Sequence, residues 1–477
     1  MNAKKDLNLG LALLPIIAMI VLLVISYGQL KLPIESLLLV SASVSAAVAY
    51  WQGYRWIDIM NAIVNKLAKA MPVILILICV GGMISSWMLS GTIPYMVYWG
   101  LKLVSPQYIV ITSFLITCAT SVCTGTSWGT AGTVGVALMG VAAGPDVSLA
   151  ATAGAVVSGA YFGDKLSPLS DSTNFAAIVA ETDLYSHIRH LMYTTLPSFG
   201  LAAAVYLCFG YTTPSSHAAN LGKVNQFVTS IENLYHFNML LLLPPILVLG
   251  GAMTKLSVIP LMLAASVLAI DLGIILQGFT LQQGFISLIH GFNMSMFTAQ
   301  GTDVAGLLDD IPRLLDRGGM FSIMSTILLV LCTFSFAGAL TLTGALTVII
   351  NRLLKMIKGV GQLIAATVAT TLLVTGATSD GKLALLIPAE LFRESYQRME
   401  LDNKNLSRTV EDAGTVTEPL LPWTSAGVYM ASTLGVSTLD FVPWAIQCYA
   451  AIIFALIYGF TGFGIARLPS TTTQANP

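Results

Sequence analysis

The fold is decided by one polar stretch inside a long apolar region, Gly163-Asp164-Lys165-Leu166-Ser167-Pro168-Leu169-Ser170-Asp171-Ser172-Thr173-Asn174. It combines carboxylates, hydroxyls, an amide and a proline. A charged side chain at the centre of a membrane costs roughly 2.5–3.5 kcal/mol on insertion scales, so such a cluster needs a compensating role. We interpret this stretch as the unwound middle of a broken transmembrane helix that binds an ion.

The composition supports a membrane environment. Of 477 residues, 56% are hydrophobic and 9% are charged, and the mean hydropathy is +0.81. Soluble domains carry about 25% charged residues. The chain is therefore predicted to be an all-α polytopic membrane protein. A net charge of −1 gives no basic face for nucleic acid. The six cysteines are scattered through apolar segments without a CxxC pair, which argues against disulfides, zinc or another cofactor.

The first half of the chain contains five predicted spans. A membrane span needs about 20 apolar residues, and suitable segments lie at 11–28, 33–52, 72–90, 149–180 and 191–210. The fourth is interrupted by the polar stretch. Residues 107–143 are apolar but are interrupted by glycine, threonine and serine at Thr124–Thr130, which predicts a re-entrant hairpin with its tip there. Non-helical backbone at membrane depth is tolerated only inside protein or beside a water-filled cavity. Interfacial helices are predicted at 53–70 and 92–104, and 181–190 is predicted to return to the surface.

The second half follows the same order. Spans are predicted at 236–253, 256–276, 319–343, 409–436 and 441–463, the fourth again broken. A second hairpin covers 361–394, with its tip at Thr375–Gly381, and 277–299 and 346–358 are predicted to be interfacial. We expect a charged insertion at 300–318 and a polar loop at 395–408. This divides the chain into an N-terminus (1–10), a first repeat (11–210), a linker (211–235), a second repeat (236–463) and a tail (464–477).

The two halves match each other in sequence. A shift of 251 residues places Thr124 and Gly125 on Thr375 and Gly376, and the same shift superposes the breaks: Gly163, Pro168 and Leu169 fall on Gly414, Pro419 and Leu420. Five spans in each repeat is an odd number, so the two repeats are predicted to insert with opposite topology. Interrupted helices at matching positions of inverted repeats indicate a transporter's binding site.

Lysine and arginine predict the orientation. With the N-terminus inside, fourteen of these residues fall on the cytoplasmic side and five outside. Both termini are therefore predicted to be cytoplasmic. The prediction requires that 277–299 does not cross the membrane.

Four polar breaks are predicted to meet near the middle of the membrane. Broken helices free backbone carbonyls, which bind hard cations together with side-chain oxygens. The candidate ligands from the first half are Ser167, Ser170, Asp171, Thr173, Asn174, Thr124, Thr126 and Ser127; those from the second half are Thr378, Ser379, Asp380, Asp412, Thr415, Thr417 and Glu418. A Na⁺ site is predicted at Asp171, Thr173 and Asn174.

Partly buried carboxylates are the groups that can bind either Na⁺ or a proton. The candidates are Asp164, Asp171, Asp380, Asp412 and Glu418. Asp171 comes first, because it is expected to lie deepest, and Glu418 comes second. Asp164 has two alternatives: to coordinate the ion, or to pair with Lys165 or with a charge from the other repeat. His187 and His190 are interpreted as part of an interfacial arm, with pH sensing as the alternative.

Several of these motifs resemble the NhaC family of sodium/proton antiporters. They are the residue 163–174 stretch, Thr182-Asp183-Leu184, His187-Ile188-Arg189-His190, Thr124-Gly125-Thr126-Ser127-Trp128, Glu411-Asp412-Ala413-Gly414-Thr415 and Pro422-Trp423. The resemblance implies membership of the ion transporter superfamily, with paired re-entrant hairpins, inverted repeats and often a homodimer. It also covers proteins that exchange organic acids or carry amino acids.

The sequence thus predicts a secondary antiporter of the cell (inner, plasma) membrane that exchanges H⁺ for Na⁺ or Li⁺. The alternative is a sodium- or proton-coupled transporter of a small carboxylate or amino acid, such as malate or lactate. The absence of a clearly membrane-embedded arginine favours the inorganic ion. A channel fits less well, because carboxylates at two matching breaks suit proton-coupled exchange. An enzyme is not expected, because no nucleophile–base set or metal cluster is evident.

Overall fold

The structure is a computed structural model that describes residues 7–23, 32–103, 106–143, 147–212, 217–254, 256–301 and 310–468. Throughout these residues the chain is helical, and the pairing of Leu401 with Arg467 is an isolated bridge outside any strand. The prediction of an all-α protein is therefore confirmed. The predicted tail beyond Leu468, the end of the first span and residues 302–309 of the predicted insertion lie outside the described residues.

The first half forms the following helices: α1 (Leu9–Val21), α2 (Ile34–Trp51), α3 (Trp56–Ser90), α4 (Thr92–Leu103), η2 (Pro106–Tyr108), α5 (Ile109–Thr124), α6 (Ser127–Thr130), η3 (Ala131–Gly135), α7 (Val136–Ala142), α8 (Leu149–Leu166), α9 (Asp171–Val179) and α10 (Leu184–Thr212). The predicted hairpin corresponds to α5 to α7, which turns at Gly125 and Thr126. The predicted broken span corresponds to α8 and α9.

The second half forms α11 (His217–Leu234), η4 (Met239–Leu242), α12 (Leu243–Met253), α13 (Val258–Gln277), α14 (Leu281–His290), α15 (Ser295–Thr298), α16 (Asp310–Leu315), η5 (Met320–Ile323), α17 (Met324–Thr343), α18 (Ala345–Leu354), α19 (Val360–Thr378), α20 (Gly381–Arg398), α21 (Asn403–Ala413), η6 (Glu418–Leu420), α22 (Ser425–Leu434), α23 (Thr438–Phe441), η7 (Val442–Trp444) and α24 (Ile446–Thr461). The second hairpin is α19 and α20, and the second broken helix is α21 and α22.

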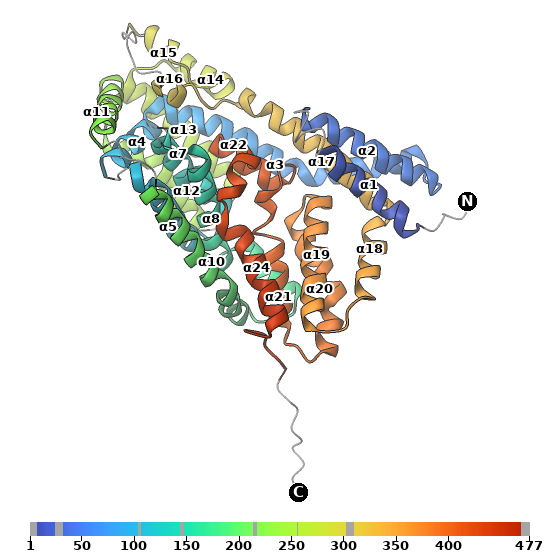
Figure 1. Ribbon diagram of the computed structural model, residues 1–477. Helices are drawn as coiled ribbons and strands as arrows, with labels where there is room; N and C mark the ends of the chain where they lie inside the picture. Colours follow the sequence, from blue (N-terminus) through green and yellow to red (C-terminus); the bar gives the residue numbers. More distant parts are fainter. Residues whose placement is uncertain are drawn as a thin grey trace.

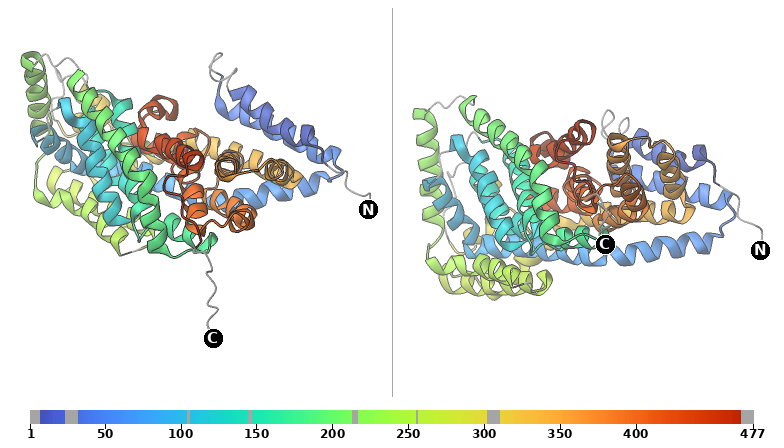
Figure 2. Two further views of the ribbon diagram at one scale, coloured as in Figure 1. Left: turned by 60° about the horizontal axis from the view of Figure 1, so that its bottom comes forward. Right: turned by 90° about the horizontal axis from the view of Figure 1, so that it is seen from below.

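The long helix α3 runs through the molecule and joins its two sides (Figures 1 and 2). It packs against α17 and against α13, while α17 packs against α2. The helices that precede the breaks, α8 and α21, lie on the other side of α3 together with α5, α10, α19, α20 and α24 (Figure 1). Each half of the chain thus buries apolar helix surface against the other half.

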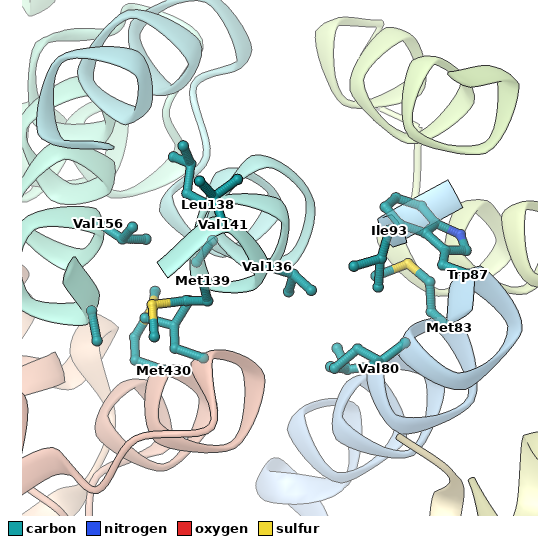
Figure 3. Packing of buried hydrophobic residues seen from close by; sticks show 14 of the residues in the cluster. Val80, Met83, Trp87, Ile93, Val136, Leu138, Met139, Val141, Val156 and Met430 are labelled. Carbon is teal, nitrogen blue, oxygen red and sulfur yellow. The ribbon is translucent and has the colours of Figure 1, made fainter. Parts of the chain in front are cut away.

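One large apolar cluster includes residues of α3, α7 and α22. Figure 3 shows part of it, with Met83 and Trp87 on α3, Val136 and Met139 on α7, and Met430 on α22. Trp87 and Met430 are fully buried. Dense packing of this kind resists small displacements, so it gives the first hairpin and the second broken helix a rigid common support.

The helices α5 and α8 approach each other especially closely. A Cβ atom on Gly163 would lie 2.4 Å from the backbone nitrogen of Val122, and one on Gly159 would lie 2.1 Å from the Thr117 hydroxyl. Small residues at such interfaces let helix backbones come into contact within a membrane. This contact holds the first hairpin against the end of α8, where the polar stretch begins.

Six helices in the described part of the chain are long and apolar enough to cross a membrane, or up to eight if each of two bent pairs forms one span. The polytopic membrane architecture is thus confirmed, although fewer helices than the ten predicted spans have the length and apolar composition of a membrane span. The remaining predicted spans are short or broken. Helix α1, for instance, has 13 described residues, and α8 and α9 are separated by the polar stretch.

Two predicted boundaries at the surface of the first half are wrong. The predicted interfacial helix at 53–70 and span at 72–90 form one 35-residue helix, α3, which continues through Pro72. Neighbouring helices can compensate for the hydrogen bond that a proline removes. The predicted start of a span at 191 is also wrong, because residues 184–190 form the first turns of α10. Tyr185, Ser186 and Arg189 are exposed there, as expected at the surface, whereas His187 and His190 are 0% and 5% exposed.

Two segments between the predicted spans also differ, and a third agrees with its prediction. Residues 395–408 are not a loop, because α20 extends to Arg398 and α21 begins at Asn403. The predicted linker contains the helix α11. Within 277–299, α14 has 10 residues. At 1.5 Å per residue such a helix is too short to cross a membrane, as the predicted orientation requires.

Candidate functional site

The first break follows directly from the sequence of the polar stretch. Pro168 cannot continue a helix, because it lacks a backbone N–H, and α8 ends at Leu166. Ser170 then caps α9 by accepting a hydrogen bond from the backbone N–H of Thr173. The Thr173 hydroxyl donates to the carbonyl oxygens of Asp164 and Lys165 at 3.1 and 3.2 Å. The side-chain amide of Asn174 donates to the carbonyl oxygens of Pro168 and Ser170 at 2.8 and 2.7 Å. The second half-helix thus satisfies carbonyls that the break exposes.

Asp164 lies at the first break and contacts the tip of the first hairpin. Its carboxylate accepts a hydrogen bond from the Ser127 hydroxyl at 2.7 Å, and the residue is 8% exposed. Thr126 begins the short helix α6 by accepting from the N–H of Gly129, which holds Ser127 at the tip. The predicted meeting of the hairpin with the break is therefore present.

The second break places Glu418 beside the tip of the second hairpin. The Ser425 hydroxyl donates to the Glu418 carboxylate at 2.8 Å and lies 3.0 Å from the carbonyl oxygen of Ser379. The tip is so close that a Cβ atom on Gly381 would lie 2.5 Å from a Glu418 carboxylate oxygen. Ser379 has a positive φ of 53°, a conformation that ends α19 sharply.

Asp380 has a structural role and an electrostatic one. It caps α20 by accepting from the N–H groups of Lys382 and Leu383. Its other oxygen lies 3.9 Å from the amine of Lys66, a residue of α3 that is 7% exposed. The charge of Asp380 also acts on Glu418. One lysine and two carboxylates therefore share this region.

A buried ion pair connects the two broken helices. Lys165, in the last turn of α8, donates to Asp412 of α21, and both side chains are 0% exposed. Thr194 of α10 donates to the same carboxylate oxygen at 3.1 Å. The alternative that Asp164 pairs with Lys165 is thus not observed here; Lys165 pairs with the other half of the chain.

The sequence analysis missed two fully buried charged residues on α21. Glu411 and Arg408 are both 0% exposed. Arg408 donates to the carbonyl oxygen of Gly464 at 2.8 Å, while its Nε and Nη2 atoms have no partner in the described part of the chain. The expectation that no arginine is embedded is therefore wrong. The helical spacing of Arg408, Glu411 and Asp412 could have indicated it, had 395–408 not been assigned to a loop.

The two buried histidines join α10 to the start of α21. His187 Nδ1 lies 2.7 Å from the Ser407 hydroxyl, and His190 Nε2 lies 3.1 Å from the Asn405 side-chain oxygen. The interpretation of these residues as an interfacial arm is wrong. Just before α10, the backbone N–H of Ser186 donates to Asp183, which holds the pKa of that carboxyl group below its usual value.

The predicted Na⁺ ligands Asp171, Thr173 and Asn174 do not converge in this structure. Asp171 is exposed at the first position of α9 and is not the deepest carboxylate. Thr173 and Asn174 are engaged with backbone carbonyls. Of the remaining candidates, Thr124 donates to the carbonyl of Thr120 and Ser167 to that of Val122, while Thr378 and Thr415 are buried.

A cavity of about 440 Å³ lies at the C-terminal end of α22. Its lining includes Ile93, Val136 and Met139, whose side chains Figure 3 shows between α3 and α7, and the polar residues His290, Asn293 and Ser432. Tyr429, one turn before Ser432 on α22, stacks on Trp128 at the tip of the first hairpin. An aromatic pair thus lies between Ser432 at the cavity and Ser127 at the Asp164 site.

The chain matches the Na⁺/H⁺ antiporter family model over residues 159–463. This range contains both breaks, the second hairpin and the Lys165–Asp412 pair. The chain belongs to the Na⁺/H⁺ antiporter family. The antiporter is therefore a transporter and not an enzyme, and it is a multi-pass membrane protein.

Relatives of the antiporter extend over its full length. It is 51% identical to an uncharacterized Na⁺/H⁺ antiporter of Haemophilus influenzae over 454 residues, which cover 95% of this chain and 96% of the relative. It is 33% identical to the Na⁺/H⁺ antiporter NhaC of Alkalihalophilus pseudofirmus, with 99% of both chains covered. It is also 32% identical to a malate-2H⁺/Na⁺-lactate antiporter of Bacillus subtilis, with 94% and 93% covered. The resemblance to the NhaC family is confirmed.

Proposed function

We propose that this antiporter exchanges Na⁺ for H⁺ across the cell membrane at the buried carboxylates of its two helix breaks. The observation that carries the proposal is that each break presents one carboxylate to a hydroxyl from a half-helix or hairpin tip: Asp164 to Ser127, and Glu418 to Ser425. A buried carboxylate is stable only when it is neutralised. Either a proton or Na⁺ supplies the missing charge, and the two ions compete for it.

The exchange follows from this competition. The buried carboxylate must carry one cation before its access changes from one side of the membrane to the other. That cation is either H⁺ or Na⁺. Asp164 and Glu418 suit this role better than Asp171, because they are shielded by the hairpins. Asp380 and Asp412 already face Lys66 and Lys165, so we assign them to charge balance. The hydroxyls of Ser127 and Ser425 are neutral oxygens in direct contact with the carboxylates of Asp164 and Glu418.

We propose further that the two halves are inverted repeats. Helix α2 packs along α17 while α13 packs along α3. In the order of the two halves, α2 corresponds to α13 and α3 corresponds to α17, so the two contacts are reciprocal. A twofold pseudosymmetry axis in the membrane plane produces such reciprocal contacts. It also explains why Lys165 of the first break meets Asp412 before the second.

The distribution of lysine and arginine supports the proposal that both termini are cytoplasmic. Lys66 and Arg408 are buried and no longer count as loop charges. Removing them from the cytoplasmic side leaves twelve lysines and arginines there against five outside, so the bias keeps its sign.

A second candidate is the exchange of a small carboxylate. Arg408 favours it, because a buried guanidinium with unpartnered donors can bind a carboxylate through two hydrogen bonds. One relative carries malate and lactate in its name. Asp412, one turn away on α21, also acts on Arg408, but it is bound to Lys165. The family match and the most similar of the relatives described above carry the name Na⁺/H⁺ antiporter, so we rank the inorganic exchange first.

Purified protein in proteoliposomes tests both candidates. A NaCl pulse without organic solute, at zero membrane potential, is expected to move protons across the membrane, whereas choline chloride is not. Each unit by which the pH is lowered raises the H⁺ concentration tenfold. The Na⁺ concentration for half-maximal exchange is therefore expected to rise as the pH falls. If NaCl gives no response but Na⁺ with malate or lactate does, the small-carboxylate candidate is correct and the proposal is wrong.

A further inference from the structure

Glu411 has an unusual position in the protein. It is fully buried on α21, yet neither of its carboxylate oxygens has a hydrogen-bond partner in the described part of the chain. Leaving a buried carboxylate without partners is costly, and the cost is larger when the group is ionised. The other carboxylates of the site differ in this respect, because Asp164, Asp412 and Glu418 all accept hydrogen bonds from side chains.

The charges around Glu411 leave it uncompensated. Lys165 is the charged group that acts on it most strongly, followed by Asp164 and then Asp412. Lys165, however, is already bound to Asp412. Arg408 acts on Asp412 from one turn away. Glu411, Asp164 and Asp412 carry three negative charges, and Lys165 and Arg408 carry two positive ones. One negative charge is therefore left over when all five groups are ionised.

The groups from other elements do not remove this charge. The positive charge of Lys165 also acts on His187 of α10 and on Cys448 of α24. His187 Nδ1 is committed to Ser407, and the Thr415 hydroxyl facing Glu411 is neutral. A single monovalent cation at Glu411 would make the cluster neutral. That cation can be a proton or Na⁺. Only one of them can bind at a time, because a second cation would give the cluster a positive charge.

We infer that Glu411 is a third carboxylate of the exchange site, beside Asp164 and Glu418, at which Na⁺ displaces a transported proton, with the Lys165–Asp412 pair as the fixed charges beside it. The inference rests on the proposed exchange and names a residue that the sequence analysis did not select. In the proton-loaded form the carboxyl group of Glu411 is neutral. When Na⁺ binds its carboxylate oxygens, that proton is released, and the total charge of the cluster is unchanged.

Proton release by the purified protein tests this assignment without transport. The full-length antiporter in detergent and weak buffer receives NaCl, and a pH indicator records released protons. Wild type is expected to release protons, and Glu411→Gln is expected to release clearly fewer, because only Asp164 and Glu418 remain to exchange them. Glu394→Gln is the matched control, since Glu394 is 79% exposed and pairs with Arg398 at the surface; it is expected to behave as wild type.

A second variant covers the case in which Glu411→Gln does not fold. Glu411→Asp keeps the carboxylate but moves it by one methylene, so it is expected to release protons at a higher Na⁺ concentration. Infrared difference spectra are expected to show a carboxylic acid C=O band that disappears on adding Na⁺, with its frequency shifted in Glu411→Asp. Unchanged release in Glu411→Gln, or an unchanged Na⁺ dependence and infrared band in Glu411→Asp, would overturn the inference.

The two levels of the proposal fail in different ways. If wild type releases no protons on adding NaCl, the proposed Na⁺/H⁺ exchange itself is wrong. If wild type and Glu411→Gln release the same number of protons, the exchange stands and only the assignment to Glu411 is wrong.

Discussion

The indole ring of Trp128 stacks on the ring of Tyr429, with centroids 4.2 Å apart and planes inclined by 12°. The Tyr429 hydroxyl also donates to the carbonyl oxygen of Trp128 at 2.8 Å. Trp128 belongs to the tip of the first hairpin and Tyr429 to the second broken helix. This pair therefore links the hairpin tip of one half to a half-helix of the other.

We expect the two rings to be energetically coupled. Stacked aromatic pairs contribute about 0.5–1.5 kcal/mol beyond their buried area. A double-mutant cycle with Trp128→Ala and Tyr429→Ala, measured by unfolding in mixed detergent micelles, is expected to give a coupling energy in this range. Tyr429→Phe keeps the stack and should lose only the hydrogen bond. Strictly additive effects of the two alanine substitutions would show that the stack does not couple the halves.

The buried ion pair predicts an asymmetric response to substitution. Lys165→Met or Asp412→Asn alone leaves an uncompensated charge, which costs about 3–5 kcal/mol of unfolding free energy. The double variant removes both charges and is expected to recover much of that loss. Unfolding in mixed micelles measures all three variants. The pair has no such importance if the double variant is less stable than either single one.

Gly381 is expected to be required for the position of Glu418. In Gly381→Ala the new methyl group would lie 2.5 Å from a Glu418 carboxylate oxygen, so the carboxylate must move. Such overpacking costs about 1–3 kcal/mol, equivalent to roughly 5- to 150-fold weaker Na⁺ binding if it falls entirely on the site. The Na⁺ concentration for half-maximal exchange in proteoliposomes is the measurement.

Gly200→Ala provides the control for this experiment, because Gly200 is also helical and has no atom within 4 Å of the added Cβ. It is expected to leave Na⁺ dependence unchanged. Wild-type Na⁺ dependence in Gly381→Ala would remove Glu418 from the site.

Burial predicts the relative importance of the two aspartates in the polar stretch. Asp164 is 8% exposed and bound to Ser127, whereas Asp171 is exposed at the start of α9. Asp164→Asn is expected to slow exchange by about a hundredfold or more, as for loss of a proton-transferring group. Asp171→Asn should retain most of the activity, with at most about 0.3–1 kcal/mol lost at the start of α9. The initial rate of Na⁺-driven proton movement decides between them.

Much of this architecture could be predicted from the sequence because its causes are local. Hydropathy over about 20 residues predicts a span, and Pro168 with its neighbouring hydroxyls predicts a break. The hairpin turns at Gly125 and Ser379 follow from residues within a few positions of each turn. The repeated Thr-Gly and Pro-Leu motifs likewise placed matching breaks in both halves.

The roles of the individual charges were decided only by the tertiary structure. Asp164 and Asp171 are seven positions apart in one motif, yet one is buried against Ser127 and the other is exposed. Lys165 and its partner Asp412 are 247 residues apart. A polar residue in an apolar chain must find a partner, but hydropathy does not identify it. That choice depends on how α8 and α21 pack together, which is also what leaves Glu411 buried without a partner.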